Sequence, residues 1–295
     1  MLQKQYFFDL LRTLRRWVRL IGFFLWSGTQ RFIFRRNNVP VRVYGDLKIW
    51  VSARDYRGYR VWQTRGSQKE KVKIIERFST SGPSAFFDVG ANYGEFSIMP
   101  ASMGVYCLMF EPNPLVFSFL QQTMAPYPMA RPIPQAVGSG CGSATFSFCR
   151  AASGSGSLAA QTPMREARYL GRTNLLDKID IVITTLDQVV KSEGVDLSKG
   201  VVLKIDVEGF EREVMTGAMD VLSLTPWWRA LVEFSPAALK DAGKDVAQEW
   251  AFFRKFGGVI AQNGIPDTLQ NMRLPPEPPR HDVDLLLGSG EMPSC

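Results

Sequence analysis

A short glycine-containing turn offers the clearest chemistry in this chain. Residues 85–89 form an apolar run that carries Asp88, and the chain then passes through Gly90 and Gly94 before a helical pattern begins. Glycines allow positive φ angles and close approach of the backbone to a ligand, and the first N–H groups of a helix attract polar ligand groups. The pattern therefore predicts a buried strand that leads a nucleotide-like ligand to the start of a helix.

A carboxylate follows the next apolar run. Residues 105–110 are apolar, and Glu111 comes directly after them, before Pro112-Asn113-Pro114. A carboxylate in this place can accept hydrogen bonds from both hydroxyls of a ribose. Its distance from the glycine turn is about the 20 residues found in dinucleotide-binding proteins. Spacing alone does not separate a nicotinamide cofactor from another ligand that contains adenosine.

The composition of the turn narrows the choice of ligand. It has no G-x-G-x-x-G pattern, since Ala91 and Asn92 stand between Gly90 and Gly94. Asp88 and Glu95 would repel a phosphate but would attract an ammonium or sulfonium group, and S-adenosylmethionine carries both of these charges. The alternative is that Asp88 only orders the loop.

A pair of carboxylates marks a third strand end. Asp206 and Glu208 lie two residues apart after the apolar run 201–205, which also holds Lys204. Such a pair can act as general base toward a hydroxyl, orient a substrate, or bind Mg²⁺, although nothing further in the sequence indicates a metal. In the alternative, Glu208 caps the next helix and Lys204 is a buried ion-pair partner. Glu233, near the end of a later strand, is a further candidate.

The elements that must position these residues alternate between strand and helix. This alternation predicts a doubly wound, Rossmann-like α/β sheet, whose carboxyl edge would hold the three strand ends. Between residues 138 and 200 the rhythm breaks, with short strands at 145–149 and 181–184 and a Ser/Gly loop at 153–157. The expected strands of the sheet are 85–89, 105–110, 131–137, 201–205, 230–234, 258–262 and 283–287, and the expected helices are 95–103, 114–124, 211–222 and 245–256.

Four motifs in order resemble the FkbM family of S-adenosylmethionine-dependent methyltransferases: residues 88–94, 110–114, 185–187 and 204–211. The resemblance covers about residues 80–290. It implies the class I methyltransferase fold, with a mostly parallel seven-stranded sheet whose last strand is antiparallel. It also implies O-methylation of a hydroxyl on a sugar, glycolipid or secondary metabolite.

The resemblance also implies a role for each motif residue. The donor S-adenosylmethionine would meet Glu111 at its ribose, and the acceptor, a small molecule or glycan, would meet Asp206 and Glu208. Two alternatives stay open: an NAD-type oxidoreductase on a similar sheet, and a non-catalytic donor-binding or membrane-associated scaffold. The sequence specifies neither the acceptor nor the oligomeric state. The residues implied at the methionine part of the donor are Asp88, Gly90, Asn92 and Gly94.

Charge and composition limit the partners. Residues 1–80 hold 18 Lys/Arg and 5 Asp/Glu, a net charge of +13, whereas the remaining residues hold 17 and 23, a net charge of −6. The basic character therefore belongs to the N-terminal segment, and we expect no nucleic-acid partner. A single histidine argues against a zinc site, and four cysteines without a CxxC pair fit a reducing, cytoplasmic compartment.

The chain divides into three segments by these patterns. We expect a basic amphipathic helix over residues 1–36 and a hairpin and a helix over residues 37–80. We expect the methyltransferase domain over residues 81–295. The apolar stretch 17–26 is too short for a span, which needs about 20 residues. The helix either packs on the main domain or a partner, or makes a peripheral contact with an anionic membrane through residues 6–36.

Overall fold

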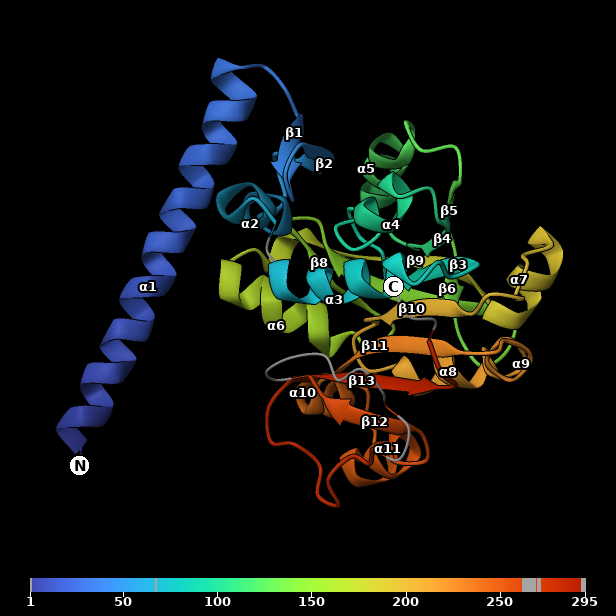
Figure 1. The fold of residues 1–295 in the computed structure, drawn as a ribbon. Helices are drawn as coiled ribbons and strands as arrows, with labels where there is room; N and C mark the ends of the chain where they lie inside the picture. Colours follow the sequence, from blue (N-terminus) through green and yellow to red (C-terminus); the bar gives the residue numbers. More distant parts are fainter. Residues whose placement is uncertain (1, 67, 262–268, 270–271, 293–295) are drawn as a thin grey trace.

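A seven-stranded sheet forms the centre of the computed structural model, which describes residues 2–66, 68–261, 269 and 272–292 (Figure 1). The strand order is β12-β13-β11-β10-β3-β4-β5, and β13 alone runs in the direction opposite to the other six strands. This topology confirms the predicted mostly parallel sheet with one antiparallel strand. The strands are β3 (Ala85–Val89), β4 (Tyr106–Phe110), β5 (Ala130–Ile133), β10 (Val201–Ile205), β11 (Trp228–Phe234), β12 (Gly257–Ile260) and β13 (Val283–Ser289).

The register of the central strands sets the positions of the polar residues. Lys204 of β10 lies opposite Asp88 of β3. Ile205 lies opposite Val232 of β11, so the next residues along the two strands are Asp206 and Glu233. Because these strands are parallel, their carboxyl ends meet at one edge, where open α/β sheets bind ligands. The predicted gathering of strand-end residues at this edge is confirmed.

Two of the predicted helices that cover the sheet differ from the sequence prediction, and α7 and α10 were not predicted. Residues 94–97 form turns, so that the first helix begins only at Ile98, and the predicted helix 211–222 is divided at Gly217-Ala218. A Cβ on Gly217 would overlap the carbonyl oxygen of Gly138, so the chain is pinched against another segment there. The helices are α4 (Ile98–Ser102), α5 (Pro114–Met124), α7 (Leu186–Glu193), α8 (Glu211–Thr216), α9 (Met219–Leu224), α10 (Pro236–Asp241) and α11 (Val246–Phe253).

A second sheet, of order β6-β9-β7-β8, fills the region where the predicted rhythm breaks. Two predictions were wrong here: residues 153–157 form a strand instead of a loop, and the predicted strand 131–137 divides between the two sheets. Strand β8 could not be predicted from strand propensity because it contains glycines. A Cβ on Gly156 would lie 2.5 Å from the ring of Phe146, so the packing requires glycine there. The elements are β6 (Ala136–Val137), β7 (Gly142–Cys149), β8 (Ala152–Ser157), α6 (Gln161–Leu170) and β9 (Leu176–Thr184).

Between the N-terminal helix and residue 81 the chain forms a hairpin and two helices. The hairpin and the second helix were predicted, and the first helix was not. One apolar cluster contains Val41, Ile49 and Ile75 of this segment together with Phe86 and Ile98 of the main domain. The segment therefore shares its core with the sheet. Its elements are β1 (Asn38–Val43), β2 (Leu47–Ser52), α2 (Tyr56–Thr64) and α3 (Lys69–Thr80).

The N-terminal helix α1 (Leu2–Gly28) lies beside α2 along one side of the molecule and continues into η1 (Thr29–Ile33), a π-helical turn (Figure 1). Leu20, Phe23 and Trp26 are buried, and the rings of Phe23 and Trp26 lie 5.8 and 5.6 Å from that of Tyr59. This face packs on the domain, as one of the two sequence alternatives predicts. In the described part of the chain, no helix has the length and apolar character needed to cross a membrane.

Candidate functional site

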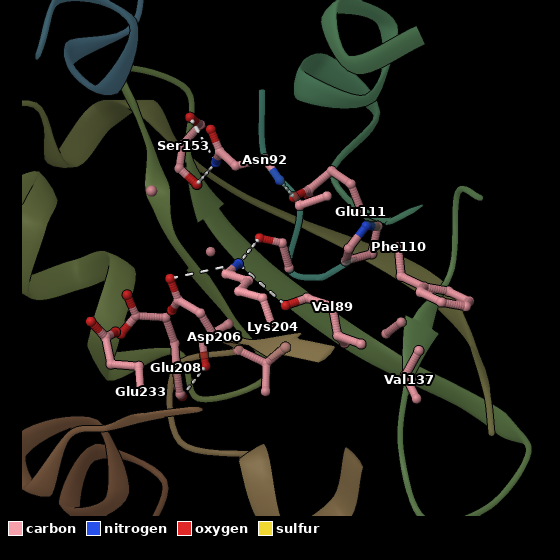
Figure 2. Close-up of a pocket in the computed structure, with 18 of the residues that line it drawn as sticks. Val89, Asn92, Phe110, Glu111, Val137, Ser153, Lys204, Asp206, Glu208 and Glu233 are labelled. Carbon is pink, nitrogen blue, oxygen red and sulfur yellow. Dashed lines mark hydrogen bonds and ion pairs between the residues drawn. The ribbon is translucent and has the colours of Figure 1, made fainter. Parts of the chain in front are cut away.

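A cavity of about 270 Å³ opens at the carboxyl edge of the main sheet (Figure 2). Its walls come from the turn after β3, the tip of β4, strand β8 of the second sheet, and the ends of β10 and β11. Arg57 and Gln68 of the N-terminal segment also line it. The cavity therefore lies where the sequence predicts a ligand, but more of the chain encloses it than the motifs suggest.

The turn after β3 is fixed by close backbone packing. Gly90 has a φ of +79°, and a Cβ there would overlap the carbonyl oxygen of Asp206. The N–H groups of Gly90 and Ala91 both donate to the carbonyl of Phe110, at 3.0 Å each. Asn92, also at positive φ, donates from its side-chain amide to the carbonyl and hydroxyl oxygens of Ser153, at 3.3 Å each. The turn thereby joins β4, β8 and β10 around the cavity.

Glu111 presents a held carboxylate at the tip of β4. One carboxylate oxygen accepts from the N–H of Asn92 and the other from the N–H of Asn113, each at 2.9 Å. Burial raises the pKa of Glu111 to about 7, and these two hydrogen bonds oppose the rise. Each oxygen keeps a further lone pair, so the group can accept two more donors from a ligand.

Lys204 ties the centre of the site together. Its ammonium group lies 3.2 Å from the carboxylate of Asp88 and 3.8 Å from that of Asp206, and it donates to the carbonyl of Gly90 at 2.6 Å. Burial lowers the pKa of Lys204, but the nearby Asp88 and Asp206 carboxylates outweigh this and raise it. The lysine is therefore a permanent buried cation that holds the glycine turn against β10.

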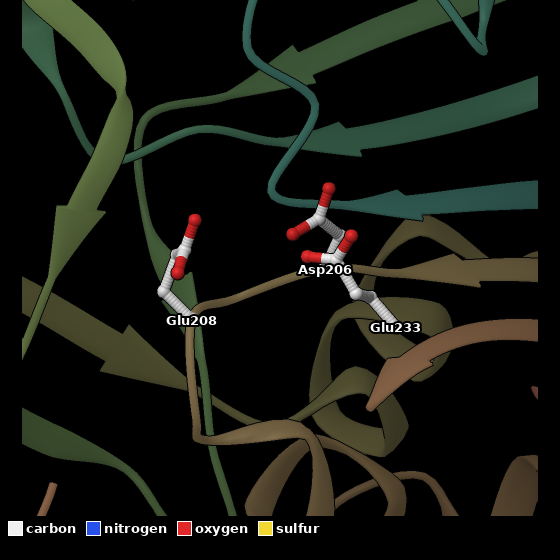
Figure 3. Close-up of side chains that lie close together, drawn as sticks. All are labelled: Asp206, Glu208 and Glu233. Carbon is white, nitrogen blue, oxygen red and sulfur yellow. The ribbon is translucent and has the colours of Figure 1, made fainter. Parts of the chain in front are cut away.

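Three carboxylates face one another at one end of the cavity (Figure 3). Asp206, Glu208 and Glu233 can each place an oxygen within 4.8 Å of the others, so together they could hold a divalent cation. Burial raises the pKa of Asp206, but Lys204 and Lys71 outweigh it and keep that pKa below the usual value. The charge of Asp206, then burial, raises the pKa of Glu233 to about 8. Burial and the other two acids raise that of Glu208.

The N-terminal segment supplies charged partners that the sequence motifs did not reveal. The guanidinium of Arg57 lies 2.8 Å from the carboxylate of Glu95, which also accepts from the Tyr44 hydroxyl at 2.8 Å and the Gln68 N–H at 3.0 Å. Lys71 lies 3.5 Å from Glu233 and 2.7 Å from Asp284. These partners are 27 to 213 positions apart in the sequence, so no local pattern connects them.

Five of the seven predicted site residues line the cavity. The two that do not are Asp88 and Gly94. Asp88 is fully buried, accepts from the hydroxyl of Ser97 at 2.6 Å, and faces Lys204. Its place in the structure makes it a support for Lys204, and a direct contact with the donor stays a prediction. Gly94 shapes the turn, with a φ of +83°. The residues that line the cavity as predicted are Gly90, Asn92, Glu111, Asp206 and Glu208.

Comparison with known proteins gives one family match and several structural alignments with low scores. A family profile described as the methyltransferase FkbM domain matches residues 88–260. No curated protein sequence matches the chain.

Three solved structures are among those that align with this chain. A tRNA (uracil-54, C5)-methyltransferase from Pyrococcus abyssi is 8% identical, with 86% of this chain and 44% of that chain covered and a TM-score of 0.40. Magnesium protoporphyrin IX methyltransferase from Synechocystis PCC 6803 is 13% identical (77% and 81% covered, TM-score 0.35). A SAM-dependent methyltransferase from Agrobacterium tumefaciens is 9% identical (86% and 70% covered, TM-score 0.38). This chain thus spans less than half the length of the Pyrococcus enzyme.

Proposed function

The chain belongs to the FkbM methyltransferase family, and from that premise we propose that it methylates a hydroxyl group of a sugar, glycolipid or secondary metabolite, with S-adenosylmethionine as donor. The observation that carries the proposal is that one cavity has an apolar end and an acidic end. Phe110 and Val137 lie on one side of Lys204, and the carboxylates of Asp206 and Glu208 lie on the other (Figure 2).

The residues present fit this donor. The apolar side chains of Phe110 and Val137 suit an adenine ring, and Glu111 beside them can accept both hydroxyls of a ribose. The ionised carboxylate of Asp206 at the acidic end suits the positive charge of a sulfonium group. An NAD-type cofactor would instead bring a pyrophosphate to a turn followed by the buried acid Glu95.

Asp206 is the proposed general base. Bound S-adenosylmethionine supplies a methyl group on positively charged sulfur, which reacts with an oxygen nucleophile once the two are aligned. Lys204 and Lys71 keep Asp206 ionised, so that its carboxylate can take the proton released by the acceptor hydroxyl. Glu233 forms a side-chain hydrogen bond with Asp206 and carries a proton below about pH 8, and it would thereby hold Asp206 in place.

Donor affinity should depend on pH through Glu111. Its pKa of about 7 belongs to the free site, and ribose hydroxyls that donate to the carboxylate would lower it. Between these two pKa values, protons compete with the ligand. We therefore expect the dissociation constant for S-adenosylhomocysteine, measured by calorimetry, to rise as pH falls below 7, by up to about tenfold per pH unit.

Two variants assign this dependence. Glu111→Gln should bind about 10- to 100-fold more weakly at pH 8, because a charge-assisted hydrogen bond is lost, and should show little change with pH. Glu233→Gln removes another group that titrates near neutrality and should keep the native slope. A native dissociation constant that is equal at pH 8 and pH 6 would contradict the role given to Glu111.

Ligand binding and methyl transfer test the proposed function in two steps. Calorimetry should detect binding of S-adenosylhomocysteine and no binding of NAD. The reverse result would favour the oxidoreductase alternative. Transfer of labelled methyl groups should then be measured over a panel of sugars, glycolipids and hydroxylated metabolites. Tight donor binding with no transfer to any member of the panel would favour the non-catalytic scaffold.

A further inference from the structure

The side of α1 that faces away from the domain carries an apolar stripe. It consists of Leu14, Trp17, Val18, Ile21 and Leu25, which are between 55% and 67% exposed. Their spacing of three and four residues puts them on one face of the helix, over about 17 Å of its length. We call these five residues the outer stripe.

The outer stripe is separate from the face that packs on the domain. The packed face uses Leu20, Phe23 and Trp26, which are almost fully buried. One helix therefore has two apolar faces, and only one of them contributes to the fold. Just after the helix, Phe32, Ile33 and Phe34 are also exposed, by 56% to 74%. Large apolar groups gathered in this way on a surface indicate an interaction site.

The positive charge of the protein is concentrated in the same segment. Residues 1–36 hold 8 of the 35 Lys/Arg and 1 of the 28 Asp/Glu, a net charge of +7. The other 259 residues hold 27 of each kind and are neutral overall. Exposed basic residues on and after the helix include Arg19, Arg35 and Arg36. The segment that carries the stripe is therefore strongly cationic.

Arginines of η1 and of the domain line a groove beside the helix. A groove of about 570 Å³ between α1 and the domain is lined by Arg31, Arg54, Arg150 and Arg172, together with the apolar side chains of Phe23 and Phe24. The guanidinium of Arg172 lies 4.9 Å from the centre of the Phe24 ring. Within the described part of the chain, only Arg150 of these arginines has a carboxylate partner, Asp177.

We propose that the outer stripe, together with Phe32–Phe34, docks the protein on an anionic lipid bilayer. The apolar side chains would enter the boundary between headgroups and acyl chains, and exposed arginines of the same segment, Arg35 and Arg36 directly after Phe34, would meet lipid phosphates. A second copy of this helix would bring two segments of charge +7 together, which opposes a dimer through this face. A nucleic acid would match the charge but would leave Val18, Ile21 and Leu25 without a favourable contact.

Vesicle flotation of the full chain tests the proposal. The native protein should float with vesicles of phosphatidylcholine and phosphatidylglycerol, at least about tenfold more than with phosphatidylcholine alone, and less so as salt is raised. The variant Val18→Gln/Ile21→Gln/Leu25→Gln should lose at least about tenfold in vesicle partition. Its thermal unfolding and S-adenosylhomocysteine binding should stay native, because these side chains do not contribute to the core.

A matched variant controls for the general loss of exposed apolar groups. Val182, Met219 and Leu224 are exposed elsewhere on the protein, and Val182→Gln/Met219→Gln/Leu224→Gln should float like the native chain. The proposal fails if the native protein stays with the bottom fraction, or if the stripe variant floats as well as the native protein. Light scattering adds a third overturning result: a native dimer that the stripe variant converts to a monomer would assign the stripe to a second copy. Salt-dependent binding of duplex DNA that exceeds vesicle binding would overturn it in favour of a nucleic acid.

Discussion

Replacing Asp206 by asparagine should lower the turnover number about 10²- to 10⁴-fold, with the affinity for S-adenosylhomocysteine changed by no more than about twofold. The reason is that asparagine keeps the size of the side chain but cannot take a proton. Asp206 is the carboxylate at the acidic end whose pKa is lowered, so it is the one that stays ionised while Glu208 and Glu233 tend to be protonated. The measurement is methyl transfer to any acceptor that the panel identifies, beside calorimetry of the donor product.

A change of the same chemistry elsewhere gives the control. Asp180 is exposed in β9 and bonds to Thr145, so Asp180→Asn should leave turnover native. Full turnover by Asp206→Asn with normal donor binding would exclude Asp206 as the base. A loss confined to donor affinity would instead make it a binding residue.

Lys204→Met should lower the free energy of unfolding by about 3–5 kcal/mol, the largest stability effect expected from one substitution in the site. The side chain is 4% exposed and faces Asp88, which is fully buried. Methionine fills a similar volume but leaves the Asp88 carboxylate without its cation. It also removes the hydrogen bond to the Gly90 carbonyl that holds the glycine turn. The affinity for S-adenosylhomocysteine should therefore fall together with stability.

A double variant separates charge from packing. Burial already raises the pKa of Asp88, with Lys204 opposing the rise, so this pKa should rise further in Lys204→Met. Stability of the variant would then fall as pH rises from the usual aspartate pKa, about 4, toward the raised one. Adding Asp88→Asn should restore part of the lost stability at pH 8, as followed by urea unfolding. If the double variant is less stable than Lys204→Met alone, the uncompensated charge is not the cause.

The sequence was sufficient for the parts of the site that depend on local pattern. The buried run 85–89 is followed by a glycine turn and the runs 105–110 and 201–205 by a carboxylate, and parallel strands place such ends at one edge. Glu111 and Asp206 therefore lie in one cavity, as predicted. Glu233 could also be identified from its place near the end of a strand.

What the sequence did not reveal depends on packing between distant segments. Strand β8 is formed by Ser and Gly residues, which have low strand propensity, and it exists because Gly156 leaves room for Phe146. The side-chain direction of Asp88 follows from its register with Lys204, its partner on the adjacent strand β10. Arg57 and Lys71 reach the site from helices α2 and α3, which precede the motifs, and no spacing rule links them to Glu95 or Glu233.

The hydrogen bonds to Glu95 have a consequence for exchanging parts between relatives. A chimera that took residues 81–295 from this chain and the preceding segment from another would inherit a buried anion whose Arg57, Tyr44 and Gln68 donors were left behind. The boundary at residue 80 separates two compositions but cuts through one electrostatic unit. Recombination after η1, near residue 36, would keep this unit whole.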